Sequence, residues 1–179
     1  MTHKLPKIIF FGTEDYSLGT LQALVGAGFI VSAVITKPDA ARGRGQKITE
    51  SPVKTYALAH NIPVMTPAKL RDITEDIRAL QPVAGILVAY GKIIPQSIID
   101  LFEPGIINLH PSLLPRWRGP SPIEAAISHS DTETGVTIMK LEAAMDAGPI
   151  YAQKSIPLTG TETKPELYET LFSLGNSLL

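Results

Sequence analysis

Cysteine is absent from this chain of 179 residues. Disulfides and thiolate metal sites are therefore excluded, and the absence is consistent with a reducing compartment. The formal net charge is only −1, so the molecule as a whole does not attract nucleic acid, and such a contact would require a local basic patch. No apolar run approaches the ~20 residues of a membrane helix, and the run ending at Gly12 is too short for a signal segment. We therefore expect a soluble, cytoplasmic protein.

Signatures of nucleotide and metal binding are also missing. Gly12-Thr13-Glu14 follows the first predicted strand, but the chain has neither the G-x-G-x-x-G fingerprint nor a Walker loop. Neither a dinucleotide site nor a triphosphate site is supported. No pair of histidines or carboxylates has the spacing of metal ligands, so we expect no metal site.

Hydrophobic residues make up 44% of the chain and charged residues 18%, which is typical of a globular domain. Short β-branched runs alternate with helical patterns, and most of the runs are too continuously apolar for a sheet with one wet face. The alternation predicts an α/β fold: a Rossmann-like, doubly wound, mostly parallel sheet with helices on both faces. The predicted strands are Lys7–Gly12, Ile30–Thr36, Val83–Tyr90, Gly105–His110 and Val136–Leu141.

Three helix starts are readable in the sequence. Ser51-Pro52 and Ser121-Pro122 each place an N-cap before a proline suited to the first helical turn. The helices that they open are predicted at Val53–His60 and Ile123–Ser128. The segment Thr163-Lys-Pro-Glu166 is a capping box before a final helix.

Two stretches break this rhythm. Lys37–Glu50 is a polar, Gly-rich loop that carries the compact basic cluster of Arg42, Arg44 and Lys47. Its glycines would let these side chains approach phosphates closely, although a solvated loop with two arginines is also common. Pro111–Pro122 is a long, Pro-rich loop with a tryptophan between two arginines. Both loops follow strand C-termini, where ligands bind in open α/β sheets.

Asn108 and His110 stand where the fourth predicted strand gives way to a loop. Side chains at i and i+2 point to the same side of a strand, so an amide and an imidazole would face one pocket. Asn can donate to a carbonyl oxygen that becomes an oxyanion, and His can donate to it or move a proton, which suits acyl-group transfer. Asp146, 36 positions beyond His110 (146 − 110), is the best third member, because one helix and one returning strand can close that distance.

Each of these residues also has a purely structural interpretation. Asn108 could bond the backbone of a neighbouring loop, His110 could be a buried, satisfied histidine, and Asp146 could support its turn. Ser112 has no G-x-S-x-G elbow around it, which favours a loop-capping role over that of a nucleophile.

Several ordered motifs resemble those of a known family. Asn108-Leu-His110 and Ser112–Gly119 are similar to elements that mark all folate-dependent formyltransferases. The basic Arg-Gly-Arg-Gly loop, together with R-W-R-G, resembles more narrowly the catalytic domain of the methionyl-tRNA formyltransferase family. The resemblance runs from about Lys7 to the end of the chain. Its remaining motifs are Phe11-Gly-Thr13, Ser51-Pro-Val-Lys54, Val88–Pro95, Thr134–Met139 and Met145-Asp146.

This resemblance implies a function and a role for each site. Asn108, His110 and Asp146 would be the catalytic trio that transfers the formyl group of 10-formyltetrahydrofolate to the α-amine of methionine on initiator tRNA. No metal would be required, and we expect a monomer. The folate would be bound by Ala89, Tyr90, Gly91, Ile93, Ile94, Ser112, Leu113, Leu114 and Pro115. The tRNA acceptor stem would be contacted by Arg42, Arg44 and Lys47.

Residues 1–179 would form the catalytic domain, and the small C-terminal β-barrel with which the family also grips tRNA would be absent from this chain. Two other interpretations stay open. The formyl acceptor could be an amino-sugar nucleotide, since that branch shares the same core motifs, whereas a glycinamide nucleotide is disfavoured because no Gly-rich phosphate loop follows the first strand. The chain could also be a folate-binding or hydrolytic domain without an acceptor.

Overall fold

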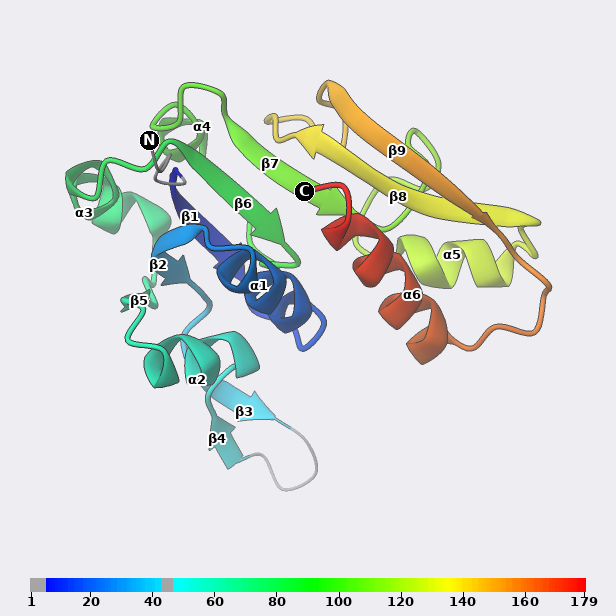
Figure 1. Cartoon of the computed structure of the whole chain (residues 1–179), viewed down its shortest axis with the longest axis horizontal. Helices are drawn as coiled ribbons and strands as arrows, with labels where there is room; N and C mark the ends of the chain where they lie inside the picture. The colour runs from blue at the N-terminus through cyan, green and yellow to red at the C-terminus, as the bar shows by residue number, and fades with distance from the viewer. Residues whose placement is uncertain (1–5, 43–46) are drawn as a thin grey trace. The chain divides into compact units, whose positions relative to one another are not determined.

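The computed structural model of the chain describes residues 6–42 and 47–179 and comprises two compact units, Met1–Ile106 and Ile107–Leu179 (Figure 1). The elements of the first unit are β1 (Lys7–Gly12), α1 (Ser17–Gly26), β2 (Ile30–Ile35), β3 (Ala40–Arg42), β4 (Lys47–Thr49), α2 (Pro52–Ala59), β5 (Val64–Met65), a 3-10 turn (Leu70–Ile73), α3 (Thr74–Ala79), β6 (Ala84–Val88) and α4 (Gln96–Ile99). Those of the second are β7 (Ile106–His110), α5 (Pro122–Ser128), β8 (Glu133–Lys140), β9 (Ile150–Pro157) and α6 (Lys164–Asn176).

Four strands of the first unit form a parallel sheet in the order β5-β2-β1-β6. From β1 the chain builds outward through β2 to β5 and then crosses back over β1 to reach β6. Because crossovers between parallel strands are right-handed, this reversal puts the connecting helices of the two directions on opposite faces. The central strand is continuously apolar, with Ile9, Phe10 and Phe11 fully buried, as a parallel sheet covered on both faces requires. The predicted doubly wound α/β fold is confirmed.

A chain of buried hydroxyl groups ties the carboxyl ends of these strands together. Thr36 Oγ1 lies 3.1 Å from Ser51 Oγ and donates to Thr13 Oγ1 at 3.2 Å. Thr13 Oγ1 in turn donates to the Tyr90 carbonyl at 3.1 Å. Each hydroxyl can therefore donate in one direction and accept in the other, and three segments that follow or flank β1, β2 and β6 are fixed without any charge.

The loop predicted at Lys37–Glu50 contains a short hairpin instead. β3 and β4 pair antiparallel, with Arg42 opposite Lys47. Each strand has only three residues, which is too short for an apolar alternation from which a strand could be predicted. Arg44, the third member of the basic cluster, lies outside the described residues.

A cluster of opposite charges closes the base of this hairpin. Lys54 Nζ on α2 lies 2.6 Å from Asp39 Oδ2 and 3.1 Å from Glu50 Oε1. The hydrogen bonds to Asp39 and then to Glu50 raise the pKa of Lys54. Partly exposed pairs of this kind contribute little to global stability. These ion pairs instead fix the position of the hairpin ends, because they attach Asp39 and Glu50 to α2.

The strands of the second unit pair antiparallel in the order β7-β8-β9. In their register Asn108 lies opposite Met139, and His110 lies opposite Thr137. β8 begins at Glu133, before the predicted start at Val136. β9 was not predicted, because most of its side chains are exposed and the polar run Gln153-Lys-Ser155 interrupts its apolar residues. The parallel pairing predicted for most of the sheet thus holds in the first unit and gives way to antiparallel pairing here.

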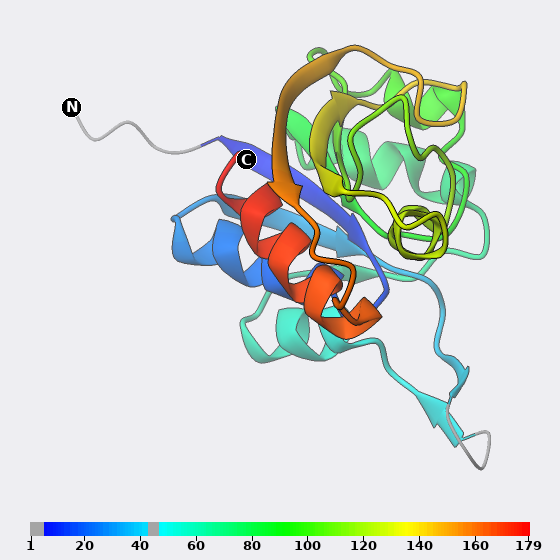
Figure 2. The ribbon, with the colours of Figure 1, turned by 90° about the vertical axis from the view of Figure 1, so that its right-hand side faces the viewer.

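Helices α5 and α6 lie side by side in the second unit (Figures 1 and 2). Ile123 of α5 packs with Leu167 and Leu171 of α6 in a buried apolar cluster. α6 also approaches the strands closely at Gly175, where a Cβ atom would stand 2.6 Å from Leu109 Cδ1. A glycine is required there because no side chain fits between the helix and β7.

Two of the three predicted helix caps form. Ser51 Oγ accepts from the Lys54 backbone N–H at 3.2 Å, and Thr163 with Glu166 makes the predicted capping box. Ser121 precedes α5 but its side chain makes no cap hydrogen bond, so the Ser-Pro signature located the helix without supplying the bond. Within residues 6–42 and 47–179, no helix combines the length and apolarity needed to cross a membrane.

Candidate functional site

His110 is the last residue of β7 and only 6% exposed. Its Nε2 lies 2.7 Å from the main-chain carbonyl oxygen of Trp117, which also accepts a hydrogen bond from Ser112 Oγ at 3.0 Å. A carbonyl can only accept, so the geometry requires a proton on Nε2. Nδ1 is then the ring nitrogen that does not take part in this bond. This also shows Ser112 in the loop-capping role that the sequence favoured over that of a nucleophile.

Asp146 occupies the turn between β8 and β9, with a left-handed backbone at φ +47° that Asp tolerates better than most residues. Its Oδ2 accepts a hydrogen bond from the Gly119 backbone N–H at 2.7 Å. The same oxygen lies 3.7 Å from His110 Nδ1. This separation is too long for a direct hydrogen bond but short enough for strong attraction once the imidazole is protonated. The side chains of His110 and Asp146 are 7% and 13% exposed, so solvent screens this attraction only weakly.

One loop therefore orients both members of the imidazole–carboxylate pair. Its Trp117 carbonyl accepts from the imidazole, and its Gly119 N–H donates to the carboxylate. Gly119 has φ +96°, a conformation that a residue with a Cβ rarely adopts. Both contacts are made by backbone groups two residues apart, which is why no side-chain pattern in the sequence identified them.

The start of this loop is held by Thr137 on β8. Thr137 Oγ1 donates to the Ser112 carbonyl at 2.7 Å and accepts from the Leu114 N–H at 3.2 Å. Gln153 on β9 adds a third anchor, since its Nε2 lies 2.8 Å from Thr137 Oγ1 and 2.9 Å from the Leu114 carbonyl. Thr137 is fully buried. Neither Thr137 nor Gln153 was among the predicted site residues, because an isolated Thr or Gln in a strand carries no motif.

Asn108 lies two positions before His110 on β7, and it is 5% exposed. The two side chains share one side of the strand, as the i and i+2 spacing predicts. The second unit therefore contains all three residues of the predicted trio. The 3.7 Å approach of Asp146 to His110 brings together two residues that are far apart in the sequence.

The residues predicted to bind folate are divided between the units. In the first unit, Ala89 and Gly91 follow β6 with φ of +47° and +73°, so the backbone turns sharply there. Tyr90 points into the core, with its ring centroid 6.0 Å from that of Phe11, and burial raises the pKa of Tyr90 to about 12. Ile93 is 88% exposed, which leaves an apolar surface open to a ligand. The other four, at positions 112–115, open the loop that follows β7 in the second unit.

In the part of the chain that the structure describes, no group of three or more His, Asp or Glu side chains is arranged to hold a metal ion.

The doubly wound parallel sheet of the first unit defines this chain as a Rossmann-like α/β protein, and the second unit carries a buried imidazole–carboxylate pair. Residues 7–179 match the Formyl transferase family, and the chain belongs to that family. Solved structures agree on the fold. Phosphoribosylglycinamide formyltransferase from Bacillus halodurans superposes with a TM-score of 0.79 at 24% identity, covering 96% of this chain and 90% of that one. Glycinamide ribonucleotide transformylase 1 from Symbiobacterium toebii gives 0.81 at 20% identity, covering 99% and 85%.

Curated relatives are more similar in sequence. The methionyl-tRNA formyltransferase of Chloroflexus aggregans is 45% identical over 175 residues, covering 97% of this chain and 57% of the relative. That of Stutzerimonas stutzeri is 46% identical over 177 residues, covering 98% and 56%. The chain thus spans little more than half the length of these relatives.

Proposed function

We propose that this chain transfers the formyl group of 10-formyltetrahydrofolate to the α-amine of methionine esterified to initiator tRNA. The observation that carries the proposal is the His110–Asp146 pair, 3.7 Å apart and next to the buried amide of Asn108. The identity of about 45% to relatives named methionyl-tRNA formyltransferase supports this acceptor.

The chemistry is an acyl transfer between two nitrogens. The neutral amine of methionine attacks the formyl carbon, a new C–N bond forms, and the formyl oxygen becomes an oxyanion. The Asn108 amide and the protonated Nδ1 of His110 donate to that oxyanion. The bond from the formyl carbon to N10 then breaks, the carbonyl re-forms, and the proton lost by the amine is transferred to N10.

The negative charge of Asp146 supports these reaction steps. A carboxylate near Nδ1 favours the imidazolium, which is the form that can donate to the oxyanion. The 3.7 Å separation leaves Nδ1 without a tight partner, so a substrate oxygen competes for its proton. Nε2 is not available for that role, because it already donates to the Trp117 carbonyl at 2.7 Å. We therefore assign the donor to Nδ1.

We further propose that the folate is bound by the residues predicted from the sequence, with the segment after β6 contributing to the pterin site. Ile93 is 88% exposed, so it offers an apolar side chain to a flat heterocycle. The sharp turn at Ala89 and Gly91 exposes backbone polar groups for the ring edge. The proposed folate contacts are Ala89, Tyr90, Gly91, Ile93, Ile94, Ser112, Leu113, Leu114 and Pro115. Tyr90 would act through its backbone, since its ring is buried against Phe11.

The basic cluster is proposed to contact tRNA phosphates. Arg42 and Lys47 pair across the hairpin, which brings two of the three basic residues together. Arg44, the third proposed contact, lies between them in the sequence and outside the described residues. The ion pairs of Lys54 with Asp39 and Glu50 attach the residues that flank β3 and β4 to α2. Such phosphate contacts position the acceptor stem without reading its sequence.

The test is a transfer assay with formyl-labelled 10-formyltetrahydrofolate and three acceptors: methionyl-initiator tRNA, methionyl-elongator tRNA and an amino-sugar nucleotide. The label is expected on methionyl-initiator tRNA, with far less on the elongator. His110→Ala serves as the control for uncatalysed transfer. Transfer only to the sugar nucleotide would refute the proposed acceptor, and release of formate with all three would instead identify a hydrolase.

A further inference from the structure

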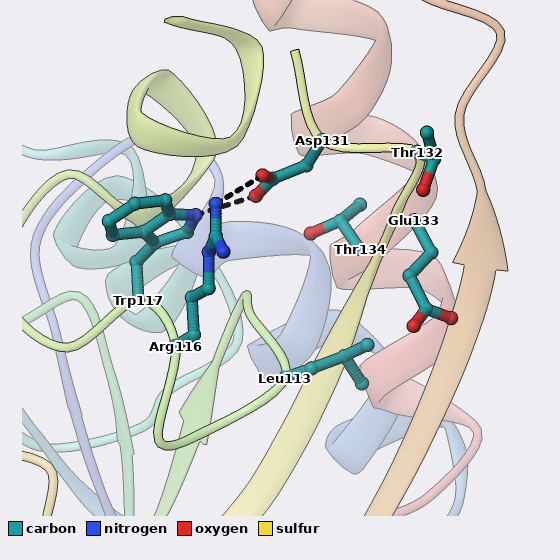
Figure 3. Close-up of a pocket in the computed structure, with 7 residues that line it drawn as sticks. All are labelled: Leu113, Arg116, Trp117, Asp131, Thr132, Glu133 and Thr134. Atoms are coloured by element: carbon teal, nitrogen blue, oxygen red, sulfur yellow. Dashed lines mark hydrogen bonds and ion pairs between the residues drawn. The ribbon is translucent and has the colours of Figure 1, made fainter. Parts of the chain in front are cut away.

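Asp131, in the turn between α5 and β8, binds two neighbouring residues of the active-site loop. Its Oδ2 accepts a hydrogen bond from Trp117 Nε1 at 2.7 Å, and its Oδ1 lies 2.6 Å from Arg116 Nη2. Figure 3 shows both side chains directed at this carboxylate. The Asp131 side chain is only 15% exposed, so these bonds are partly shielded from water. These three residues form part of the wall of a pocket of about 310 Å³.

The side chain of Trp117 has two further contacts. Its ring centroid lies 4.2 Å from that of His129, and the Arg116 guanidinium carbon lies 4.1 Å from the ring centroid. A cation over an indole ring is attractive. Together with the Asp131 bond, these contacts fix the position of the whole residue, including its main-chain carbonyl.

That carbonyl is the group that accepts from His110 Nε2 at 2.7 Å. We propose that Asp131 is a positioning residue for His110: by anchoring Trp117, it keeps the Trp117 carbonyl on Nε2 and so fixes the tautomer of the imidazole. Asp131 does not touch the imidazole or the reacting atoms. It acts through the loop, and this inference rests on the function proposed above.

The tautomer matters because the imidazole lies between two acceptors. The Trp117 carbonyl is 2.7 Å from Nε2, and Asp146 Oδ2 is 3.7 Å from Nδ1. A neutral imidazole has one proton, and the nearer acceptor holds it on Nε2. If the carbonyl moved away, the proton would be drawn to Nδ1 by the carboxylate. The Nδ1–H would then be directed at Asp146, whereas the proposed chemistry requires Nδ1 to donate to the substrate oxygen.

A simpler role for Asp131 is that of a loop staple, which would affect stability and nothing else. The two roles differ in what they predict for His110. A staple leaves the tautomer unchanged as long as the protein is folded. A positioning residue changes the tautomer in a folded protein, and a substitution that keeps the Trp117 hydrogen bond restores it.

The experiment measures the ring-nitrogen NMR signals of ¹⁵N-histidine-labelled protein at about pH 8.5, where imidazole is neutral. The chain has four histidines, and His110→Gln identifies the His110 signals by their loss. The variants are Asp131→Leu, which removes both bonds, and Asp131→Asn, which retains an oxygen that can accept from the indole N–H. Lys164→Gln is the matched control, since it breaks a 2.6 Å ion pair with Glu124 elsewhere in the same unit.

Wild type, Asp131→Asn and Lys164→Gln are expected to show neutral His110 with its proton on Nε2. Asp131→Leu is expected to show a mixture in which Nδ1 carries a large share of the proton. A pure Nε2–H signal in folded Asp131→Leu would overturn the proposal, as would an Nδ1–H signal in wild type. If Asp131→Leu does not fold, Trp117→Phe takes its place, because it keeps an aromatic ring and removes the indole N–H that donates to Asp131.

A kinetic measurement accompanies the spectrum. In Asp131→Leu we expect kcat to fall roughly 10-fold or more, as small misplacements near reacting groups do, with the KM for the formyl donor changed less than about 2-fold. Asp131→Asn is expected to recover most of the loss. An altered tautomer in a protein that formylates none of the three acceptors would contradict the proposed function and leave the role of Asp131 intact. If Asp131→Leu keeps the wild-type tautomer while the wild-type protein formylates methionyl-initiator tRNA, the proposed role of Asp131 is refuted and the proposed function stands.

Discussion

The two units hold their strand ends by different chemistry. In the first, the hydroxyls of Ser51, Thr36 and Thr13 run in a buried chain to the Tyr90 carbonyl. In the second, ionisable side chains are held by backbone groups: His110 by a carbonyl and Asp146 by an N–H. Hydroxyls keep their bonds at any ordinary pH, whereas an imidazole and a carboxylate change charge as they exchange protons. The hydroxyl chain of the first unit therefore holds strand ends in place. The imidazole–carboxylate pair of the second unit can in addition exchange protons.

The largest effect is expected when the carboxylate of the His110–Asp146 pair is removed. Asp146→Asn keeps the side-chain shape and a residue that tolerates the left-handed backbone, but it removes the carboxylate that favours the His110 imidazolium. We expect kcat to fall roughly 10²- to 10⁴-fold, the range for loss of acid–base support. The measurement is steady-state formylation of methionyl-initiator tRNA.

The control for this loss is Asp100→Asn, which removes an exposed carboxylate that accepts from Gln96 at 2.7 Å. It is expected to retain wild-type turnover. Binding of the formyl donor, measured by calorimetry, should stay within about 3-fold in both variants, because Asp146 acts on the reaction more than on the ground state. Wild-type kcat in Asp146→Asn would remove this residue from the mechanism.

A second comparison removes one hydroxyl from each unit. Thr137→Val leaves the Ser112 carbonyl and the Leu114 N–H without their partner, which should cost about 2–3 kcal/mol in urea unfolding and also lower kcat, since the active-site loop shifts. Thr36→Val interrupts the hydroxyl chain in the first unit and should cost about 1–2 kcal/mol with kcat unchanged. Equal losses of kcat in Thr137→Val and Thr36→Val would show that the hydroxyl chain of the first unit also supports the reaction.

A smaller effect is expected at the basic hairpin. Arg42→Ala should raise the KM for tRNA roughly 5-fold and reduce the slope of log KM against log salt by about 1, because one phosphate contact is lost. kcat should not change. Arg78→Ala on α3 is the matched control, since it removes an exposed arginine that pairs with Glu75. An unchanged salt slope in Arg42→Ala would place the hairpin outside the tRNA interface.

The smallest effect is expected in the first unit, on the stability of the folded state at alkaline pH. Burial raises the pKa of Tyr90 to about 12, whereas unfolded tyrosine titrates near 10. The folded state therefore loses stability as pH rises from about 10 towards 12, because only the unfolded chain can release this proton readily. Among the described residues, the Tyr90 hydroxyl has no hydrogen-bond partner, so Tyr90→Phe should leave stability at neutral pH nearly unchanged.

Urea unfolding of wild type and Tyr90→Phe at several pH values tests this expectation. The wild type should lose more stability than the variant above about pH 10. Parallel curves for the two proteins would indicate that the Tyr90 phenol ionises as easily in the folded state as in the unfolded one.

Much of the scaffold could be predicted from the sequence, because apolar runs and caps report directly on burial and helix ends. β1 has the predicted limits Lys7–Gly12, and the capping box at Thr163 begins α6. The approach of Asp146 to His110 also followed from chain order, since α5 and β8 return the chain to the same place. The roles of the trio, the folate segments and the basic cluster remain predictions.

The parts that could not be predicted depend on groups without a sequence pattern. The Trp117 carbonyl and the Gly119 N–H belong to the backbone, which every residue shares. β9 is an exposed edge strand whose apolar residues are interrupted by a polar run, and the β3–β4 hairpin is too short for any periodicity. Asp131 is a single carboxylate in a turn, and only its two bonds to the active-site loop distinguish it from other surface acids.

The close approach of Gly175 to Leu109 has a consequence for how the protein is made. Leu109 stands between the two β7 residues of the trio, and the helix that covers it arrives 66 positions later (175 − 109). On the ribosome, β7 emerges well before α6, and domains complete their folding only when all of their parts are out. We expect arrested nascent chains to protect β7 from protease only after α6 has left the exit tunnel. The residues proposed to carry the chemistry would thus be among the last to reach their working positions.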